Sequence, residues 1–153
     1  MNISELLDPQ AVIAELQATD KRGVLEELTE TLVSLVPELE RSGVLAVLCE
    51  REKLGSTGIG DGVAIPHGKI AGLSSLQLVF ARSSKGVDFE SMDGQLAQLF
   101  FLLIAPEGAV GVHLKTLARI SKLLKDSGVR KQLLAAADAT AIYQIILANE
   151  SIS

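Results

Sequence analysis

The sequence predicts an α/β layered domain, because two hydrophobic periods alternate along its 153 residues. Segments with apolar residues three or four positions apart, typical of amphipathic helices, are interleaved with short apolar or alternating runs typical of strands. Apolar residues make up 48% of the chain but aromatic residues only 3%, so we expect an aliphatic core. Since no repeat or long linker divides the chain, we expect one domain over residues 1–153.

The first third of the chain predicts a strand and two helices. Residues 11–18 form a short, partly apolar run that favours a strand over a helix. A helix is expected from Asp20, whose side chain can cap it, to Pro37, which ends it. Four leucines at helical spacing lie in this segment: Leu25, Leu28, Leu32 and Leu35. Apolar residues from Val44 predict a second helix that runs to about Lys53.

The middle of the chain predicts three strands. Residues 63–65 form a short apolar strand that Pro66 is expected to end, because proline cannot donate to a strand ladder. The next strand is indicated by apolar residues that alternate with others: Leu76, Leu78 and Phe80. A turn is expected at residues 93–94. Residues 99–104 are continuously apolar, which predicts a central strand buried on both faces.

Three helical patterns close the chain. They cover residues 113–125, about 128–137, and 138 to about 149. Asp138 can cap the last of these helices. Strands lying between helices in this order predict the layered α/β architecture rather than an all-helical one.

Composition and charge exclude several classes of function. The chain carries 14 lysines and arginines against 19 aspartates and glutamates, so it lacks the basic face that nucleic-acid binding requires. Its longest apolar run, residues 99–105, is far shorter than the roughly 18–20 residues that span a bilayer. Residues 1–5 carry no positively charged start of a secretory signal, and the single Cys49 cannot form an internal disulfide. We expect a cytoplasmic protein with no membrane insertion and no nucleic-acid partner.

Residues 55–62 hold four glycines in eight positions, a density that predicts tight turns rather than a helix or regular strand. Two phosphate-binding motifs can be tested on this stretch. The P-loop is excluded because Asp61 stands where its lysine should be. The dinucleotide motif is excluded because Val63 stands in place of its third glycine. Nucleotide binding by either route is not expected.

His67 follows this stretch and is the first candidate for chemistry. The short strand delivers it, and Gly68 leaves its ring uncrowded. Imidazole is neutral and nucleophilic near pH 7, and amide groups of a glycine-rich turn can form an anion cradle beside it. A nucleophilic nitrogen beside such a cradle resembles a phosphoryl acceptor. A structural histidine at a strand end is the alternative, and these residues alone leave both open.

His113 is the other histidine and opens a predicted helix. It shares an inward-facing stripe with three apolar residues: Leu117, Ile120 and Leu124. One interpretation is a core histidine bonded to a carbonyl, and the other is a site residue near a helix N-terminus. A metal site formed with Cys49 and His67 is not expected, because the sequence lacks any CxxC or HxxxH spacing.

Residues 51–68 closely resemble the active-site signature of the enzyme IIA domains of the mannitol/fructose type, which belong to the bacterial phosphoenolpyruvate-dependent phosphotransferase system. The signature asks for an acidic or amide residue, here Glu52, and then an apolar and a small residue, here Ile59 and Gly60. The run from Val63 to Gly68 completes it. Residues 113–117 match a second segment of the family, and the resemblance covers nearly the whole chain. A freestanding domain of this kind is most similar to the nitrogen-regulatory branch.

This resemblance implies a fold and a set of roles. The family fold is an α/β layered domain with a mixed β-sheet flanked by helices. His67 matches the histidine that accepts a phosphoryl group, and the donor would be the phosphohistidine of a small phosphocarrier protein. His113 matches the second active-site histidine, and Arg51 matches the arginine beside it. Thr57 and the Gly58 amide are weaker candidates for phosphate contacts. No metal or nucleotide cofactor is needed, because the donor arrives already activated.

Three functions compete at this point. The first is a phosphohistidine carrier that acts as a regulator, its phosphorylation state deciding which target proteins it binds. The second is a sugar-specific component that passes phosphate to the IIB domain of a fructose or mannitol permease. The third is a binding module in which His67 is structural. The residues leave open the regulated partner, the oligomeric state and the ring nitrogen of His67 that would carry the phosphate.

Overall fold

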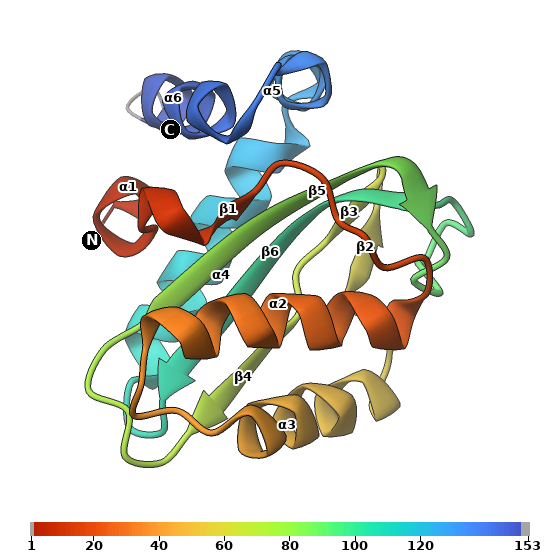
Figure 1. Cartoon of the computed structure of the whole chain (residues 1–153). Coiled ribbons are helices and arrows are strands. Elements are labelled where there is room, and N and C mark those ends of the chain that lie inside the picture. Colours follow the sequence, from red (N-terminus) through yellow and green to blue (C-terminus); the bar gives the residue numbers. More distant parts are fainter. Residues whose placement is uncertain (1, 151–153) are drawn as a thin grey trace.

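The computed structural model describes residues 2–150; Met1 and residues 151–153, the remainder of the predicted domain, lie outside the described residues. Helices and strands alternate along the chain (Figure 1). The helices are α1 (Ile3–Leu6), α2 (Lys21–Leu35), α3 (Arg41–Lys53), α4 (Val110–Lys125), α5 (Ser127–Ala135) and α6 (Ala139–Glu150), with a 3-10 turn η1 (Pro9–Ala11). The strands are β1 (Val12–Ile13), β2 (Gly58–Gly60), β3 (Val63–Ala64), β4 (His67–Ile70), β5 (Gln77–Val87) and β6 (Ala97–Pro106).

The strands of the described residues form a mixed sheet in the order β1-β5-β6-β3-β2, and β4 also pairs with β6. Strand β1 runs parallel to β5, and both β3 and β4 run parallel to β6. The pairs β5–β6 and β2–β3 are antiparallel. Helices α2 and α3 lie on one side of this sheet, and α4 lies on the other with α5 and α6 beyond it (Figure 1). The predicted α/β fold with a mixed, helix-flanked sheet is confirmed.

Strand β6 is the centre of the core, as its apolar run predicted. Every side chain from Leu99 to Ala105 is at most 1% exposed, so the strand is covered on both faces. Phe80 of β5 packs edge-on against Phe101 of β6, with ring centroids 5.0 Å apart. Burial of each large side chain of this kind stabilises the fold by about 1.5–3 kcal/mol. This rigid strand is the support on which β4 lies.

The helix predicted after Asp20 is confirmed as α2. The Asp20 carboxylate accepts a hydrogen bond from the Gly23 amide at 2.7 Å, and the helix ends one residue before Val36. Helix α3 begins at Arg41, three residues earlier than the first apolar residue suggested. Helix α4 likewise begins at Val110, which places His113 inside its first turn rather than at its start. Apolar periodicity finds the buried face of a helix but not its solvated first residues.

Two segments differ from the sequence predictions in the first half of the chain. Residues 11–18 are a strand only at Val12–Ile13. The turn η1 includes Ala11, and the amides of Gln17 and Ala18 donate to the Glu27 carboxylate instead of to a neighbouring strand. The glycine-rich stretch was predicted to contain no strand, and this is wrong, because it contains β2. Gly58 permits a close approach there, since an added Cβ would lie 2.3 Å from the Ser91 hydroxyl oxygen.

The short strand predicted to end at Pro66 does stop there, since β3 ends at Ala64, but the pairing with β6 is only interrupted. Proline lacks only the N–H group, and the carbonyl oxygen of Pro66 accepts a hydrogen bond from the Leu103 amide at 3.0 Å. Pairing along β6 therefore resumes after Pro66 as β4, with His67 opposite Leu103. His67 begins a strand rather than following the end of one. Within residues 2–150, no helix is long and apolar enough to cross a membrane.

Candidate active site

His67 is held in one orientation by the backbone. Its Nδ1 lies 2.8 Å from the carbonyl oxygen of Ile65, two residues earlier in the chain. A carbonyl oxygen can only accept, so the hydrogen of the neutral ring belongs on Nδ1. The lone pair is then on Nε2, so Nε2 is the ring nitrogen that can act as a nucleophile.

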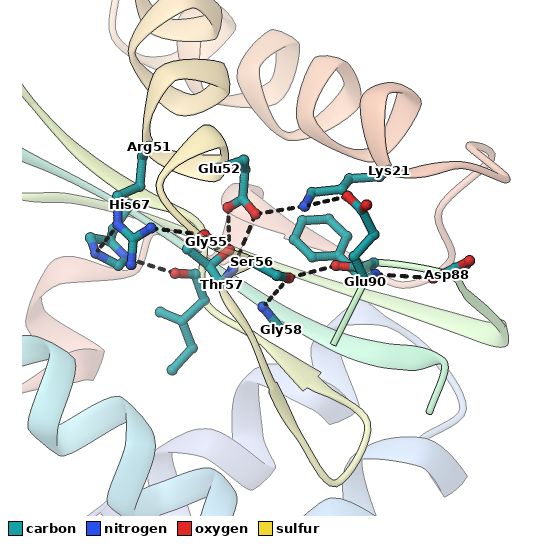
Figure 2. A network of polar contacts seen from close by, with 12 residues as sticks. Lys21, Arg51, Glu52, Gly55, Ser56, Thr57, Gly58, His67, Asp88 and Glu90 are labelled. Atoms are coloured by element: carbon teal, nitrogen blue, oxygen red, sulfur yellow. Dashed lines mark hydrogen bonds and ion pairs between the residues drawn. The ribbon is translucent and has the colours of Figure 1, made fainter. Parts of the chain in front are cut away.

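Arg51 lies on the last turn of α3 and reaches the same nitrogen (Figure 2). Its Nε–H donates to Nε2 of His67 at 3.4 Å, and its Nη1 donates to the carbonyl oxygen of Gly55 at 2.9 Å. A guanidinium group can only donate, which again makes Nε2 of His67 the acceptor. The guanidinium is therefore fixed beside the reactive nitrogen by a second, independent bond.

His113 faces His67 from α4. The two ring centroids are 5.5 Å apart and the rings lie at 68° to each other. The His113 side chain is 5% exposed, and its Nδ1 is buried without a hydrogen-bond partner. A buried nitrogen without an acceptor is better left unprotonated, so Nε2 carries the hydrogen of the neutral ring. Among residues 2–150, no carbonyl accepts a hydrogen bond from His113 Nδ1, so the interpretation as a core histidine bonded to a carbonyl is not supported there.

Both histidines favour the neutral state. Burial lowers the pKa of His67, and the nearby Arg51 cation lowers it further, although the Ile65 carbonyl and the Glu52 carboxylate act in the opposite direction. Burial also lowers the pKa of His113, as do His67 and Lys69. The site therefore presents one neutral nucleophilic nitrogen and one neutral N–H donor near pH 7.

Arg51, His67 and His113 line one pocket of about 490 Å³. Its remaining wall is mostly apolar, with Val47, Leu54, Gly68, Val110, Leu114 and Leu117 beside Glu50 and Lys69. Leu54 is 84% exposed and Leu114 is 61% exposed, so large apolar side chains surround the entrance in contact with solvent. Such a rim is typical of a surface that binds another protein.

Thr57 and Gly58 do not join this group. The Thr57 hydroxyl donates to the carboxylate of Glu52, and the Gly58 amide donates to the Ser56 hydroxyl at 3.0 Å (Figure 2). Each polar group expected to contact phosphate is thus already bonded within the protein. This differs from the sequence expectation, which could not see these two acceptors.

Sequence reasoning missed Lys69 and Lys21. Lys69 lies two residues after His67 on β4, and the period of a strand would have placed both on one face had β4 been recognised. Lys21 lies on α2 and pairs with the carboxylate of Glu52 at 2.9 Å, a contact between residues 31 positions apart with no local signal. Within residues 2–150, no group of three or more histidine, cysteine, aspartate or glutamate side chains is arranged to hold a metal ion.

Comparisons with known proteins identify the family of this chain. Residues 5–149 match the family described as "Phosphoenolpyruvate-dependent sugar phosphotransferase system, EIIA 2". A nitrogen regulatory protein of Bradyrhizobium diazoefficiens is 48% identical over 95% of both chains. A fructose-specific EIIABC component of Bacillus subtilis is 40% identical over 95% of this chain but only 23% of its own length. The crystal structure of the nitrogen regulatory protein IIA-Ntr from Neisseria meningitidis superimposes with a TM-score of 0.88 at 33% identity, covering 94% of this chain and 98% of that one.

The family match covers nearly all of the described residues, and four residues of the signature segment line the pocket: Arg51, Leu54, His67 and Gly68. The similarity covers 95% of the Bradyrhizobium nitrogen regulatory protein but only 23% of the much longer fructose-specific component. The family prediction is thereby confirmed: the chain belongs to the EIIA 2 family of the phosphoenolpyruvate-dependent sugar phosphotransferase system.

Proposed function

We propose that this chain is a phosphohistidine carrier in which Nε2 of His67 accepts a phosphoryl group from the phosphohistidine of a small phosphocarrier protein. The observation that carries the proposal is the hydrogen bond between Nδ1 of His67 and the Ile65 carbonyl, which leaves the Nε2 lone pair facing Arg51 and the pocket. The nitrogen that the sequence left open is thus assigned to Nε2.

The step balances without a metal or a second reactant. The Nε2 lone pair of His67 forms the new bond to phosphorus, and the bond between phosphorus and the donor imidazole breaks, its electron pair returning to the donor ring. The transferring group is loose and metaphosphate-like, with negative charge on its equatorial oxygens. Arg51 supplies charged N–H donors to these oxygens, and His113 supplies a neutral one.

The first turn of α4 adds to this electrostatic support. The His113 amide donates to the Ala109 carbonyl, so the free amide groups of the helix are those that precede it, from Val110 onward. Val110 lines the pocket, so this positive helix end faces the position of an incoming phosphoryl group. The apolar rim that includes Leu54 and Leu114 is proposed as the docking surface for the phosphocarrier.

We assign the carrier to regulation, within the nitrogen-regulatory branch, with its phosphorylation state selecting the target proteins that it binds. The support is the match to a nitrogen regulatory protein over 95% of both chains. A sugar-specific role, with transfer to the IIB domain of a fructose or mannitol permease, is the second candidate, because the fructose-specific relative is 40% identical. We also propose that the protein acts in the cytoplasm and that residues 1–153 form one domain.

The test is to incubate the protein with phosphoenolpyruvate and the upstream phosphotransferase components, including the phosphocarrier, and to map the modified residue. We expect one acid-labile phosphate on Nε2 of His67. A phosphate on another residue, or none, would contradict the carrier assignment. Adding fructose-type and mannitol-type IIB domains then separates the two roles, since rapid onward transfer to either domain favours the sugar-specific one.

A further inference from the structure

Behind the pocket lies a buried carboxylate that the transfer step does not use. Glu52 follows Arg51 on the last turn of α3, and its side chain is 7% exposed. It accepts hydrogen bonds from the Thr57 amide at 3.0 Å and from the Thr57 hydroxyl, and it pairs with Nζ of Lys21 at 2.9 Å (Figure 2). A buried charge is retained only where such partners compensate for its lost hydration.

The bonds to Thr57 shape the loop on which Arg51 depends. Between Glu52 and Thr57 the chain turns tightly, with the Gly55 amide donating to the Glu52 carbonyl at 3.1 Å. The carbonyl oxygen of Gly55 in turn accepts from Nη1 of Arg51. A loop pinned at Thr57 therefore sets the position of the acceptor that holds the guanidinium.

Thr57 is also connected to His67. Its carbonyl oxygen accepts a hydrogen bond from the Ile65 amide at 3.0 Å. The carbonyl oxygen of Ile65 accepts from Nδ1 of His67. One residue, Thr57, thus lies at the branch point of two short bonded paths that end on the two groups at the reactive nitrogen.

Lys21 anchors this arrangement in the core. Its Nζ lies 4.9 Å from the ring centroid of Phe89, which packs edge-on against Phe100 of β6. Burial lowers the pKa of Lys21, but hydrogen bonds to Glu52 and Glu90 outweigh this effect and raise the pKa above its usual value. Lys21 therefore stays charged and keeps the Glu52 carboxylate in place.

We infer that Glu52 is a positioning residue for phosphoryl transfer, and that Lys21 and Thr57 complete a clamp that orients both Arg51 and His67. The inference rests on the proposed function of His67 as phosphoryl acceptor. Neither Glu52 nor Lys21 lines the pocket, so the clamp acts through the loop and not on the phosphoryl group. Without the clamp, the Ile65 carbonyl is no longer held in place as the acceptor for Nδ1 of His67. The hydrogen of the neutral ring can then lie on either nitrogen, so Nε2 carries the lone pair in only part of the molecules.

The experiment compares Glu52→Gln with Glu26→Gln, which makes the same change at a glutamate on α2 whose carboxylate pairs with Arg22 and Arg41. The carboxamide of Glu52→Gln brings N–H donors to a place already occupied by three donors. We expect phosphoryl uptake from the phosphocarrier to be roughly tenfold to a hundredfold slower than in Glu26→Gln. In ¹⁵N NMR spectra of the unphosphorylated protein, His67 should change from the Nδ1–H tautomer to a mixture of both.

A second pair of variants keeps the test decisive if Glu52→Gln does not fold. Thr57→Val removes only the hydroxyl group, whereas Thr57→Ser retains it. We expect the valine variant to show slower uptake and a mixed His67 tautomer, and the serine variant to match the wild type. A merely stabilising ion pair would change the melting temperature without moving the tautomer.

Two results would overturn the inference. One is uptake by Glu52→Gln within twofold of Glu26→Gln, with the Nδ1–H tautomer retained. The other is slower uptake with an unchanged tautomer, which would show that the clamp does not orient His67. Failure of the proposed function is a separate result, seen as a wild type that takes up no phosphate. The NMR comparison needs no phosphorylation and still decides whether the clamp orients His67.

Discussion

Strands β4 and β6 are hydrogen-bonded neighbours with opposite roles. In β6 every side chain from Leu99 to Ala105 is buried and apolar, so the strand can stabilise the fold but offers no reactive group. In β4 the half-buried His67 and the exposed Lys69 face the pocket. The two strands therefore differ in what they contribute: β6 supports the backbone of β4 through hydrogen bonds, and β4 places the imidazole of the proposed site at the pocket.

The largest expected effect comes from His67→Ala on β4. We expect complete loss of phosphoryl uptake, because the nucleophilic nitrogen is gone, with a melting temperature close to that of the wild type, because the side chain is only half-buried. Mass spectrometry under conditions that preserve acid-labile phosphate, together with a thermal melt, measures both. Phosphoryl uptake equal to that of the wild type would contradict the proposed difference between β4 and β6, because His67 would then not be the phosphoryl acceptor.

The opposite pattern is expected for Leu102→Ala on β6. The Leu102 side chain is fully buried opposite Val79, so its truncation should reduce the free energy of unfolding by about 2–5 kcal/mol. Chemical denaturation measures this loss. At a temperature where the variant remains folded, its rate of phosphoryl uptake should stay close to that of the wild type, and a large fall in that rate would show that core and site are not separable.

Arg51→Lys should slow phosphoryl uptake about tenfold to a hundredfold, because a lysine keeps the charge but loses the planar pair of donors, and each bond to a charged group contributes roughly 1.5–3 kcal/mol. Stability should change little. Arg41→Lys, at a surface ion pair on the same helix, is the matched control. Rapid-quench kinetics measure the uptake rates of both variants. Equal rates would mean that Arg51 does not contribute to phosphoryl transfer.

Gly68→Ala tests whether the contact between β4 and α3 sets the site. An added Cβ at Gly68 would lie 2.4 Å from Cγ1 of Val47, so α3 must shift or Val47 must move. We expect uptake to slow about tenfold because Arg51 moves with α3. Gly43→Ala, whose Cβ meets nothing within 4 Å, should be harmless. Adding Val47→Ala to Gly68→Ala should restore the rate, and a failure to restore it would place the defect elsewhere.

The smallest effect is expected for His113→Ala. His67 keeps its nucleophile, so uptake should slow only about twofold to tenfold, the value of one neutral hydrogen bond. The melting temperature should fall little, since the vacated space opens into the pocket. Thermal melts and transfer kinetics on one preparation separate the two interpretations. A strongly lowered melting temperature with an unchanged uptake rate would favour the interpretation of His113 as a core histidine.

Local patterns in the sequence determined much of this protein. The Asp20 cap, the leucine spacing of α2 and the apolar run of β6 act over a few residues, so they can be recognised without knowing the fold. The signature over residues 51–68 likewise indicated the family, and with it the fold class. The roles of Arg51, His67 and His113 and the single-domain organisation stay predictions until they are tested.

Only the tertiary structure decided the rest. The pairing of β4 with β6 depends on a carbonyl of Pro66 meeting an amide 37 residues later, and the Glu52–Lys21 pair joins two helices. The tautomer of His67 follows from the place of one carbonyl oxygen, and Thr57 proved to bond Glu52 instead of facing the pocket. Hydrogen bonds between distant residues depend on distance and angle, which residue types alone do not specify.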